Sequence, residues 1–187
     1  MAAAEEVFGE QGLQAAHVGD IAVRAGVSVG TLYNHFEDRD ALLSALLDAR
    51  CEEMLSRVDE AAAQVAAEPF EAQLERFVRA LFENFDAHRR FFSIFFEMDS
   101  AHGRAAFPAP LRKPRPRLAE LHQRLDELMK RGVKQRALRS DDAELYSAML
   151  MGMVKAIVIR DFDGKARFDV PGRARQVTRF FLQGAGH

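Results

Sequence analysis

Apolar residues recur at three-and-four spacing along almost the whole sequence. The clearest stripes are Leu43, Leu46, Leu47, Met54, Leu55 and Val58, followed by Phe70, Leu74, Phe77, Val78, Leu81, Phe82 and Phe85. A helix gathers residues at this spacing on one face, because each turn takes about 3.6 residues. No segment shows the sustained two-residue alternation with β-branched side chains that indicates strands. The sequence therefore predicts an all-α fold.

Prolines and capping residues mark where the predicted helices begin. Pro69 and Pro171 each stand where the first turn of a helix tolerates the missing N–H. Ser140, followed by three acids, predicts a further helix start. Helices before residue 38 are short and later ones are long, so we expect a small module over residues 1–37 and a larger bundle over residues 38–187.

Composition excludes several classes of protein. No window approaches the roughly 18 apolar residues of a membrane span, and no basic region leads into an apolar run as in a secretory signal. The single cysteine, Cys51, excludes an internal disulfide framework and a multi-cysteine zinc site. We therefore expect a cytoplasmic protein with no membrane contact, no metal and no cofactor.

Charge is distributed unevenly along the sequence. Residues 1–47 hold two basic side chains against seven acidic ones, whereas residues 104–139 hold eleven basic against three acidic. Any function assigned to the N-terminal segment has to be compatible with this acidity.

Residues 18–36, VGDIAVRAGVSVGTLYNHF, predict two short helices over about 18–25 and 28–35. A helix-turn-helix needs a small residue in its first helix, a glycine of positive φ in the turn and an apolar residue inside the second helix. Ala22, Gly26 and Leu32 have the required spacing, and Ser28 can cap the second helix. The other members of the small core are expected to be Ile21, Val27 and Phe36.

The longer string AGVSVGTLYNHFEDRDALLSALL closely resembles the recognition region of the tetracycline-repressor (TetR) family of bacterial transcription regulators. Upstream, VFGEQGL is similar to the end of that family's first helix. RALRSDDAELYSAMLMGMV and VTRFFLQG resemble its last two bundle helices more weakly. The resemblance implies a three-helix DNA-binding domain with a helix-turn-helix over residues 1–37. It implies a helical effector-binding and dimerisation domain over residues 38–187.

In that family the second helix of the motif lies in the DNA major groove. Carried over position by position, the residues facing base edges would be Val29, Gly30, Thr31 and Asn34. The residues near phosphates would be Tyr33, His35 and His17, with Arg39 standing where the family often has a lysine. The chemistry agrees, because an amide can bond an adenine edge twice and threonine offers a hydroxyl and a methyl group to thymine.

Several positions depart from the family pattern. Ala16 and His17 stand where two threonines are common, so we expect a poorer cap for the helix that follows. Only about ten residues precede Gly12, and the module is acidic, so we expect weak DNA binding with a shallow salt dependence. Arg136 stands where glycine is usual, and since a left-handed arginine costs about 1 kcal/mol, we expect a reshaped turn there.

The resemblance also implies a homodimer formed through the last two helices, about 141–160 and 171–183. Ala148 and Gly152 permit close approach there, and Val177, Phe180 and Phe181 offer apolar area. The alternative is that these residues only fill the core of the monomer.

A small hydrophobic or aromatic effector is the expected ligand of the bundle. The candidate lining residues are Phe82, Phe85, Phe92, Phe95, Phe96, Tyr146, Met149 and Met153. Asn84, Glu97 and Tyr146 could supply a polar contact. The alternative is again that the aromatic and methionine residues are core.

Two other functions are alternatives to transcriptional regulation. No catalytic motif is present and Cys51 is most simply a core thiol, so we do not expect an enzyme. A helical protein-interaction module that has lost DNA binding could use Arg112, Lys113, Arg115 and Arg117 for an acidic partner. The favoured function is a ligand-responsive bacterial transcriptional regulator, expected to be a repressor, that binds a palindromic DNA operator as a dimer.

Overall fold

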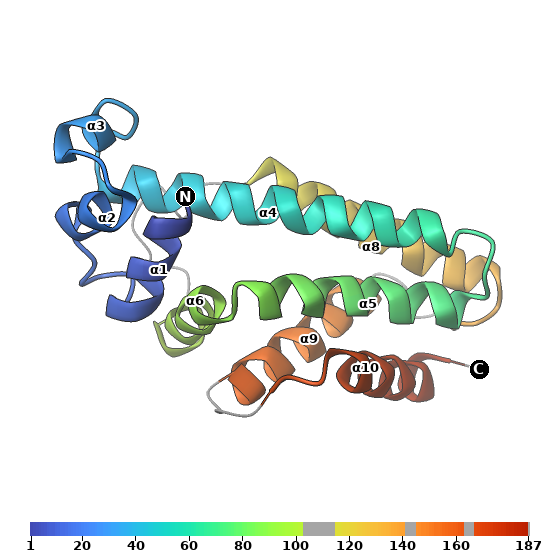
Figure 1. Ribbon diagram of the computed structural model, residues 1–187. Helices are drawn as coiled ribbons and strands as arrows, with labels where there is room; N and C mark the ends of the chain where they lie inside the picture. The colour runs from blue at the N-terminus through green and yellow to red at the C-terminus, as the bar shows by residue number, and fades with distance from the viewer. Residues whose placement is uncertain (103–114, 141–144, 163–166, 187) are drawn as a thin grey trace. The chain divides into compact units, whose positions relative to one another are not determined.

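The computed structural model describes residues 1–102, 115–140, 145–162 and 167–186, and every regular element among them is a helix (Figure 1). The prediction of an all-α fold is confirmed. The chain forms two compact units, and each combines two separate stretches of sequence. The first contains Met1–Cys51 and His88–Arg115, and the second contains Glu52–Ala87 and Pro116–His187. The functional division at residues 37 and 38 stays a prediction.

The first unit is built from short helices around the beginning of a long one. It contains α1 (Ala2–Gln11), α2 (Val18–Ala25), α3 (Val29–Tyr33), the first part of α4 (Arg39–Gln64) and α6 (Arg89–His102). Helix α1 packs against both α2 and α6, and α2 packs against α3. Its fully buried side chains include Phe8, Ile21, Leu43, Leu46 and Phe91. This core is shared among α1, α2, α4 and α6, so it cannot form from residues 1–37 alone.

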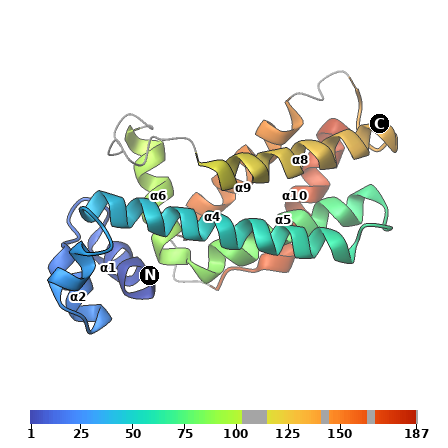
Figure 2. The same cartoon turned by 90° about the horizontal axis from the view of Figure 1, so that it is seen from above.

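The second unit is a bundle of longer helices. It contains the remainder of α4 with α5 (Phe70–Ala87), α8 (Pro116–Lys134), α9 (Tyr146–Phe162) and α10 (Val170–Ala185). Helix α10 makes its most extensive contact with α5, and the two helices lie close together in both views (Figures 1 and 2). Burial of Leu74, Leu81, Leu125 and Val177 confirms that the apolar stripes form the core. None of the helices described here is long and apolar enough to cross a membrane.

Local signals account for most helix ends. Pro171 lies in the first turn of α10, as predicted, and the Asp169 carboxylate caps this helix by accepting a hydrogen bond of 3.1 Å from the N–H of Gly172. Asp38 caps α4 in the same way, accepting from the N–H of Ala41 at 2.7 Å. The acids of the helix start predicted at Ser140 lie outside the described residues, and α9 begins at Tyr146.

The turn after α8 corrects one expectation. Arg136 has a φ of 60°, so the turn is not reshaped and the arginine itself adopts the left-handed conformation. The N–H of Arg136 donates to Val133 at 3.0 Å, and the N–H of Ala137 donates to Gly132 at 2.9 Å. These two bonds are those of a Schellman motif, in which N–H groups beyond the helix bond its last carbonyls. They hold Arg136 in the left-handed conformation.

Candidate nucleic-acid interface

A left-handed glycine sets the turn between α2 and α3. Gly26 has φ 68° and ψ 28°, as the sequence predicted, and its N–H donates to the carbonyls of Ala22 and Val23. The N–H of Val27 also donates to Ala22, at 3.1 Å. Because glycine adopts this conformation without a Cβ clash, the chain can end α2 and begin α3 within two residues.

The small core beneath this turn is only partly as predicted. Ile21 and Ala22 are buried, and Leu32 and Phe36 are half-buried. Val27 is 40% exposed, so its assignment to the core is wrong. It belongs to the turn rather than to either helix, and a side chain there is left partly in solvent.

Helix α3 is short, capped at its start and open to its surroundings. The Oγ of Ser28 accepts from the N–H of Thr31 at 3.0 Å, which confirms the predicted cap. The helix covers Val29–Tyr33 rather than 28–35, although the backbone of Asn34 remains helical. None of its residues is buried, and Val29 and Tyr33 are 42% and 53% exposed. These side chains are therefore available to another molecule.

Neither the backbone conformation nor the surroundings of Gly30 require a glycine. A Cβ at this position would meet only the Oγ of Ser28, at 3.7 Å, which is an ordinary contact. Its φ is not positive, so an alanine would fit the backbone and favour the helix. A glycine here leaves room on the outer surface of α3 for a close approach by a partner.

The two arginines of residues 1–47 are both held by other groups of the same unit. Arg24 donates to Glu10 at 2.8 Å and to Glu6 at 3.0 Å. These hydrogen bonds raise the pKa of Arg24, and the bond to Glu10 has the larger effect. Arg39 contacts Asp40 at 2.8 Å and donates to the carbonyl of Gln14 at 2.5 Å. The predicted role of Arg39 at phosphates would require it to leave or share these partners.

The remaining predicted contact residues lie at the edges of the same module. His17 precedes α2 and makes no side-chain cap, as expected from its replacement of a threonine. His17, Asn34 and His35 are exposed, and the ring of His35 lies 6.4 Å from that of Phe36. The structure thus brings the contact set to the exposed side of α2 and α3, and their role at DNA stays a prediction.

The residues predicted to line a ligand cavity fall in both units. Phe92, Phe95 and Phe96 belong to α6 in the first unit, where Phe92 and Phe96 stack at 5.8 Å. The members in the second unit are Phe82, Phe85, Tyr146, Met149 and Met153. The first three of these are buried, Met153 is half-buried and Met149 is 54% exposed. Met149 therefore faces away from the interior of its own unit.

Among the candidate polar groups whose side chains the structure describes, only Asn84 is fully buried with its hydrogen bonds unmade. Neither its Oδ1 nor its Nδ2 has a partner among the described residues. The hydroxyl of Tyr146 donates to the carbonyl of Arg139 at 2.8 Å, and the side chain of Glu97 lies outside what the structure describes. A buried amide without partners is unfavourable in the free protein, and burial alone was not visible from the sequence.

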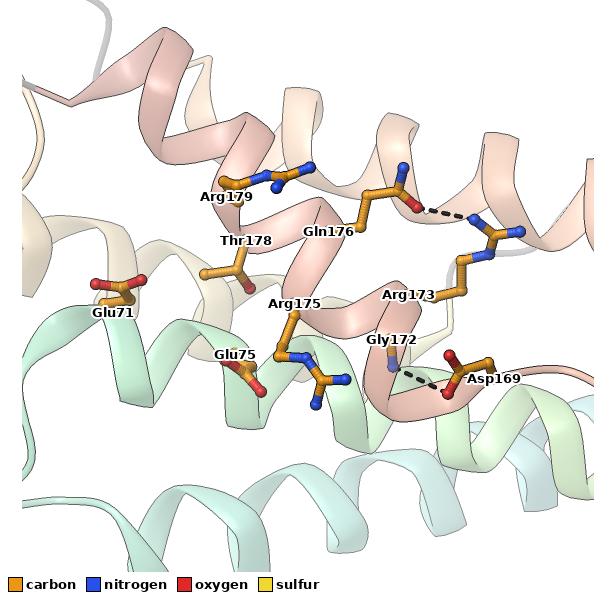
Figure 3. A pocket seen from close by; sticks show the side chains of 9 residues that line it. All are labelled: Glu71, Glu75, Asp169, Gly172, Arg173, Arg175, Gln176, Thr178 and Arg179. Atoms are coloured by element: carbon orange, nitrogen blue, oxygen red, sulfur yellow. Dashed lines mark hydrogen bonds between the residues drawn. The ribbon is translucent and has the colours of Figure 1, made fainter.

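A cavity of about 660 Å³ lies between α5 and α10 (Figure 3). Its lining includes Glu71, Glu75, Asp169, Arg173, Arg175, Gln176, Thr178 and Arg179. Arg173 donates to Gln176 at 2.8 Å, and most of the surrounding side chains are charged. This lining does not match the apolar cavity expected for a hydrophobic effector.

Cys51 has the properties of a structural thiol. Burial raises its pKa to about 11, with a smaller contribution in the same direction from Asp48 and an opposing one from Arg115. A thiol of this kind stays protonated near neutral pH, and the thiol is the weaker nucleophile. In the part of the chain that the structure covers, no group of three His, Cys, Asp or Glu side chains could hold a metal ion.

The packing of α2 through Ile21 and Ala22, the left-handed glycine and the capped α3, none of whose residues is buried, together define a helix-turn-helix DNA-binding protein. Comparisons with known proteins agree. The family model described as "Bacterial regulatory proteins, tetR family" matches residues 1–46. The HTH-type transcriptional repressor KstR2 of Rhodococcus jostii (strain RHA1) is 30% identical over 150 residues, covering 76% of this chain and 68% of that protein.

Solved structures extend the similarity of the fold beyond the matched N-terminal segment. FadR from Bacillus subtilis, in complex with stearoyl-CoA, has a TM-score of 0.81 at 19% identity and covers 98% of this chain and 96% of its own. The fatty acid degradation regulator FadR from Bacillus halodurans has a TM-score of 0.76 at 24% identity, with the same coverages of 98% and 96%. The chain belongs to the TetR family of transcriptional regulators. The prediction of a DNA-binding transcriptional regulator is confirmed over the alternative of an interaction module.

Proposed function

We propose that this regulator represses transcription in the cytoplasm by binding a palindromic operator as a homodimer, and that a small hydrophobic effector releases it. Residues 1–37 would carry the contact with DNA, and residues 38–187 would carry effector binding and dimerisation. The observation that carries the proposal is α3: it is capped, none of its residues is buried, and nothing around Gly30 requires a glycine there. The relative from Rhodococcus jostii is itself named a repressor.

In this proposal α3 enters the major groove and the flanking residues hold the phosphates. The base-facing residues are Val29, Gly30, Thr31 and Asn34, and the phosphate-facing ones are His17, Tyr33, His35 and Arg39. Tyr33 suits its role because it is 53% exposed and carries a hydroxyl that can donate to phosphate. One short helix reads few base pairs, so two copies on half-sites about one turn apart are needed for specificity.

The homodimer would form through α9 and α10, which both expose large apolar side chains. Met149 of α9 is 54% exposed, Leu145, just before α9, is 55% exposed, and Phe180 of α10 is 50% exposed. A Cβ at Gly152 would meet no atom within 4 Å, so a second helix could approach closely there. Val177 and Phe181 are buried within the protomer, so their expected part in the interface is wrong: they fill the core instead.

Asn84 supports a ligand site in the bundle. The proposed effector is largely apolar and carries one group, such as a carbonyl, that the Asn84 amide could bond. FadR from Bacillus subtilis, whose fold is similar, was solved with stearoyl-CoA, an apolar chain with such a group. The effector would release DNA only to the extent that it binds the DNA-free conformation more tightly.

The substitution Gly30→Ala tests the proposed contact with DNA. We expect the variant to be as stable as the parent protein or slightly more so, since alanine favours a helix by about 0.5–1 kcal/mol over glycine. We expect its operator affinity to fall at least about tenfold, because the added methyl group stands between the backbone and the groove. Urea denaturation measures the first quantity, and titration of fluorescent DNA from upstream of the gene measures the second.

Gly19→Ala is the matched control. Gly19 is also a helical glycine with no atom within 4 Å of an added Cβ, and it lies outside the proposed contact set. We expect its operator affinity to be unchanged. Equal affinity of the Gly30→Ala variant and the parent protein would contradict the placement of α3 in the groove.

A further inference from the structure

The exposed side chains of α3 and its continuation carry a restricted chemistry. They offer the methyl groups of Val29 and Thr31, the phenol of Tyr33 and the amide of Asn34, followed by the imidazole of His35, which the proposal assigns to phosphate. Neither arginine nor lysine is among them. This matters because the commonest specific contact to guanine is a bidentate pair from one of those two side chains.

No arginine or lysine of residues 1–47 is available to bind guanine without leaving another partner. The segment contains no lysine, and its two arginines are Arg24 and Arg39. Glu6 and Glu10 hold Arg24, while Asp40 and the carbonyl of Gln14 hold Arg39. Direct readout of G·C pairs by an arginine of this segment would therefore require a salt bridge to break.

The hydroxyl of Thr31 is already engaged inside the protein. Its Oγ1 lies 2.8 Å from the Oγ of Ser28, and the same Oγ accepts from the N–H of Thr31 at 3.0 Å. Threonine is branched at Cβ, so fixing Oγ1 toward Ser28 fixes χ1 and turns the methyl group in another direction. Since Thr31 is exposed, the group that it presents to a partner is this methyl group.

We infer that α3 recognises thymine through the methyl groups of Val29 and Thr31 and adenine through the amide of Asn34, so that the base pairs it contacts are A·T. This inference rests on the proposed operator binding. Thymine is the base whose major-groove edge carries a methyl group, and an asparagine amide matches the adjacent acceptor and donor of adenine. The Ser28–Thr31 contact then serves specificity as well as capping, because it selects which face of Thr31 is read.

The test begins with selection of operators by the full-length protein from a random duplex library. We expect A·T pairs at the contacted positions of each half-site. Replacing one of those thymines by deoxyuracil in both half-sites removes only the methyl group. Affinity should then fall about fourfold per half-site, the value of one buried methyl group.

Two variants separate the methyl group from the hydroxyl. Thr31→Val keeps a methyl group and should retain the sensitivity to deoxyuracil. Thr31→Ser keeps the hydroxyl and its contact with Ser28, and it should bind more weakly and no longer distinguish thymine from deoxyuracil at one position. Thermal denaturation of both variants verifies that each is folded.

The outcomes distinguish failure of the A·T inference from failure of the proposed operator binding. Selected half-sites dominated by G·C pairs, no response to deoxyuracil at any contacted thymine, or equal losses for the valine and serine variants would each overturn the inference while leaving operator binding intact. Failure of the folded protein to enrich any sequence would overturn the proposed function itself.

Discussion

Arg136 holds a conformation that suits glycine better than any residue with a side chain. Its φ of 60° places Cβ close to the following carbonyl, yet the two hydrogen bonds that close the end of α8 require this conformation. The side chain is exposed, so nothing in its burial compensates for the strain. The turn therefore lowers the stability of the second unit.

Arg136→Gly should raise the free energy of unfolding by about 1 kcal/mol, which corresponds to a rise in Tm of roughly 2–4 °C for a chain of this size. Urea and thermal denaturation measure the two quantities. Arg136→Ala is the control: it removes the long side chain but keeps Cβ, so we expect little change. An equal gain in both variants would show that charge, rather than backbone conformation, sets the cost.

Sequence reasoning at the scale of single residues succeeded where the signal was local. The cap at Ser28 and the left-handed turn at Gly26 depend on residues within a few positions of one another, and both are confirmed. The prediction of a reshaped turn at Arg136 was wrong, because the hydrogen bonds that end α8 outweigh the preference of arginine for a right-handed conformation. The exposure of Val27 and the unpaired amide of Asn84 depend on neighbours distant in sequence, which no local pattern reveals.

Among the elements, α1 is joined to α4 and α6 by one polar cluster. His88, which lies just before α6, accepts through Nε2 from the guanidinium of Arg50 at 2.8 Å, and its Nδ1 is hydrogen-bonded to the carboxylate of Glu5 at 2.7 Å. Arg50 and Glu5 are 14% and 17% exposed and approach within 3.7 Å. The arrangement fits a neutral imidazole with its proton on Nδ1, donating to the carboxylate and accepting from the guanidinium.

Glu5→Gln should weaken the attachment of α1, because it removes the negative charge that contacts both His88 and the largely buried Arg50. We expect a loss of about 2 kcal/mol in the free energy of unfolding, the usual value of a hydrogen bond to a charged group. Faster amide hydrogen exchange in α1 should accompany it. Both are measured on the full chain.

Glu6→Gln provides the comparison from the next position of the same helix. Glu6 also pairs with an arginine, Arg24, but it is 57% exposed, so its loss should cost under about 0.5 kcal/mol. Equal losses for the two variants would refute the argument from burial. The sequence could not predict this contrast, since Glu5 and His88 are 83 positions apart.

At the scale of the whole molecule, the oligomeric state decides how tightly α3 can bind the operator. Phe180→Arg replaces the one large apolar side chain that α10 exposes with a charge, and a two-fold interface would bring two such charges together. We expect a monomer by light scattering and a loss of operator affinity of at least about tenfold, because the half-sites no longer bind cooperatively.

Gln123→Arg adds the same charge to the exposed side of α8, away from the proposed interface. It should remain a dimer with unchanged affinity. A dimeric Phe180→Arg variant would place the interface elsewhere, and a monomeric parent protein would remove the basis of the palindromic operator. The pattern of apolar residues predicted both helices, but not which apolar residues stay exposed, because this depends on how α9 and α10 pack.

Helix α4 passes without interruption from Cys51 in the first unit to Glu52 in the second. Anyone engineering a hybrid repressor would be tempted to exchange residues 1–37 for those of a relative with another target. That graft would separate Phe8 and Ile21 from Leu43, Leu46 and Phe91, which complete the same core. A hybrid that preserves this packing has to take residues 1–51 and 88–115 from the same parent. Changing the target promoter in this way therefore needs several junctions between the two parent sequences rather than one.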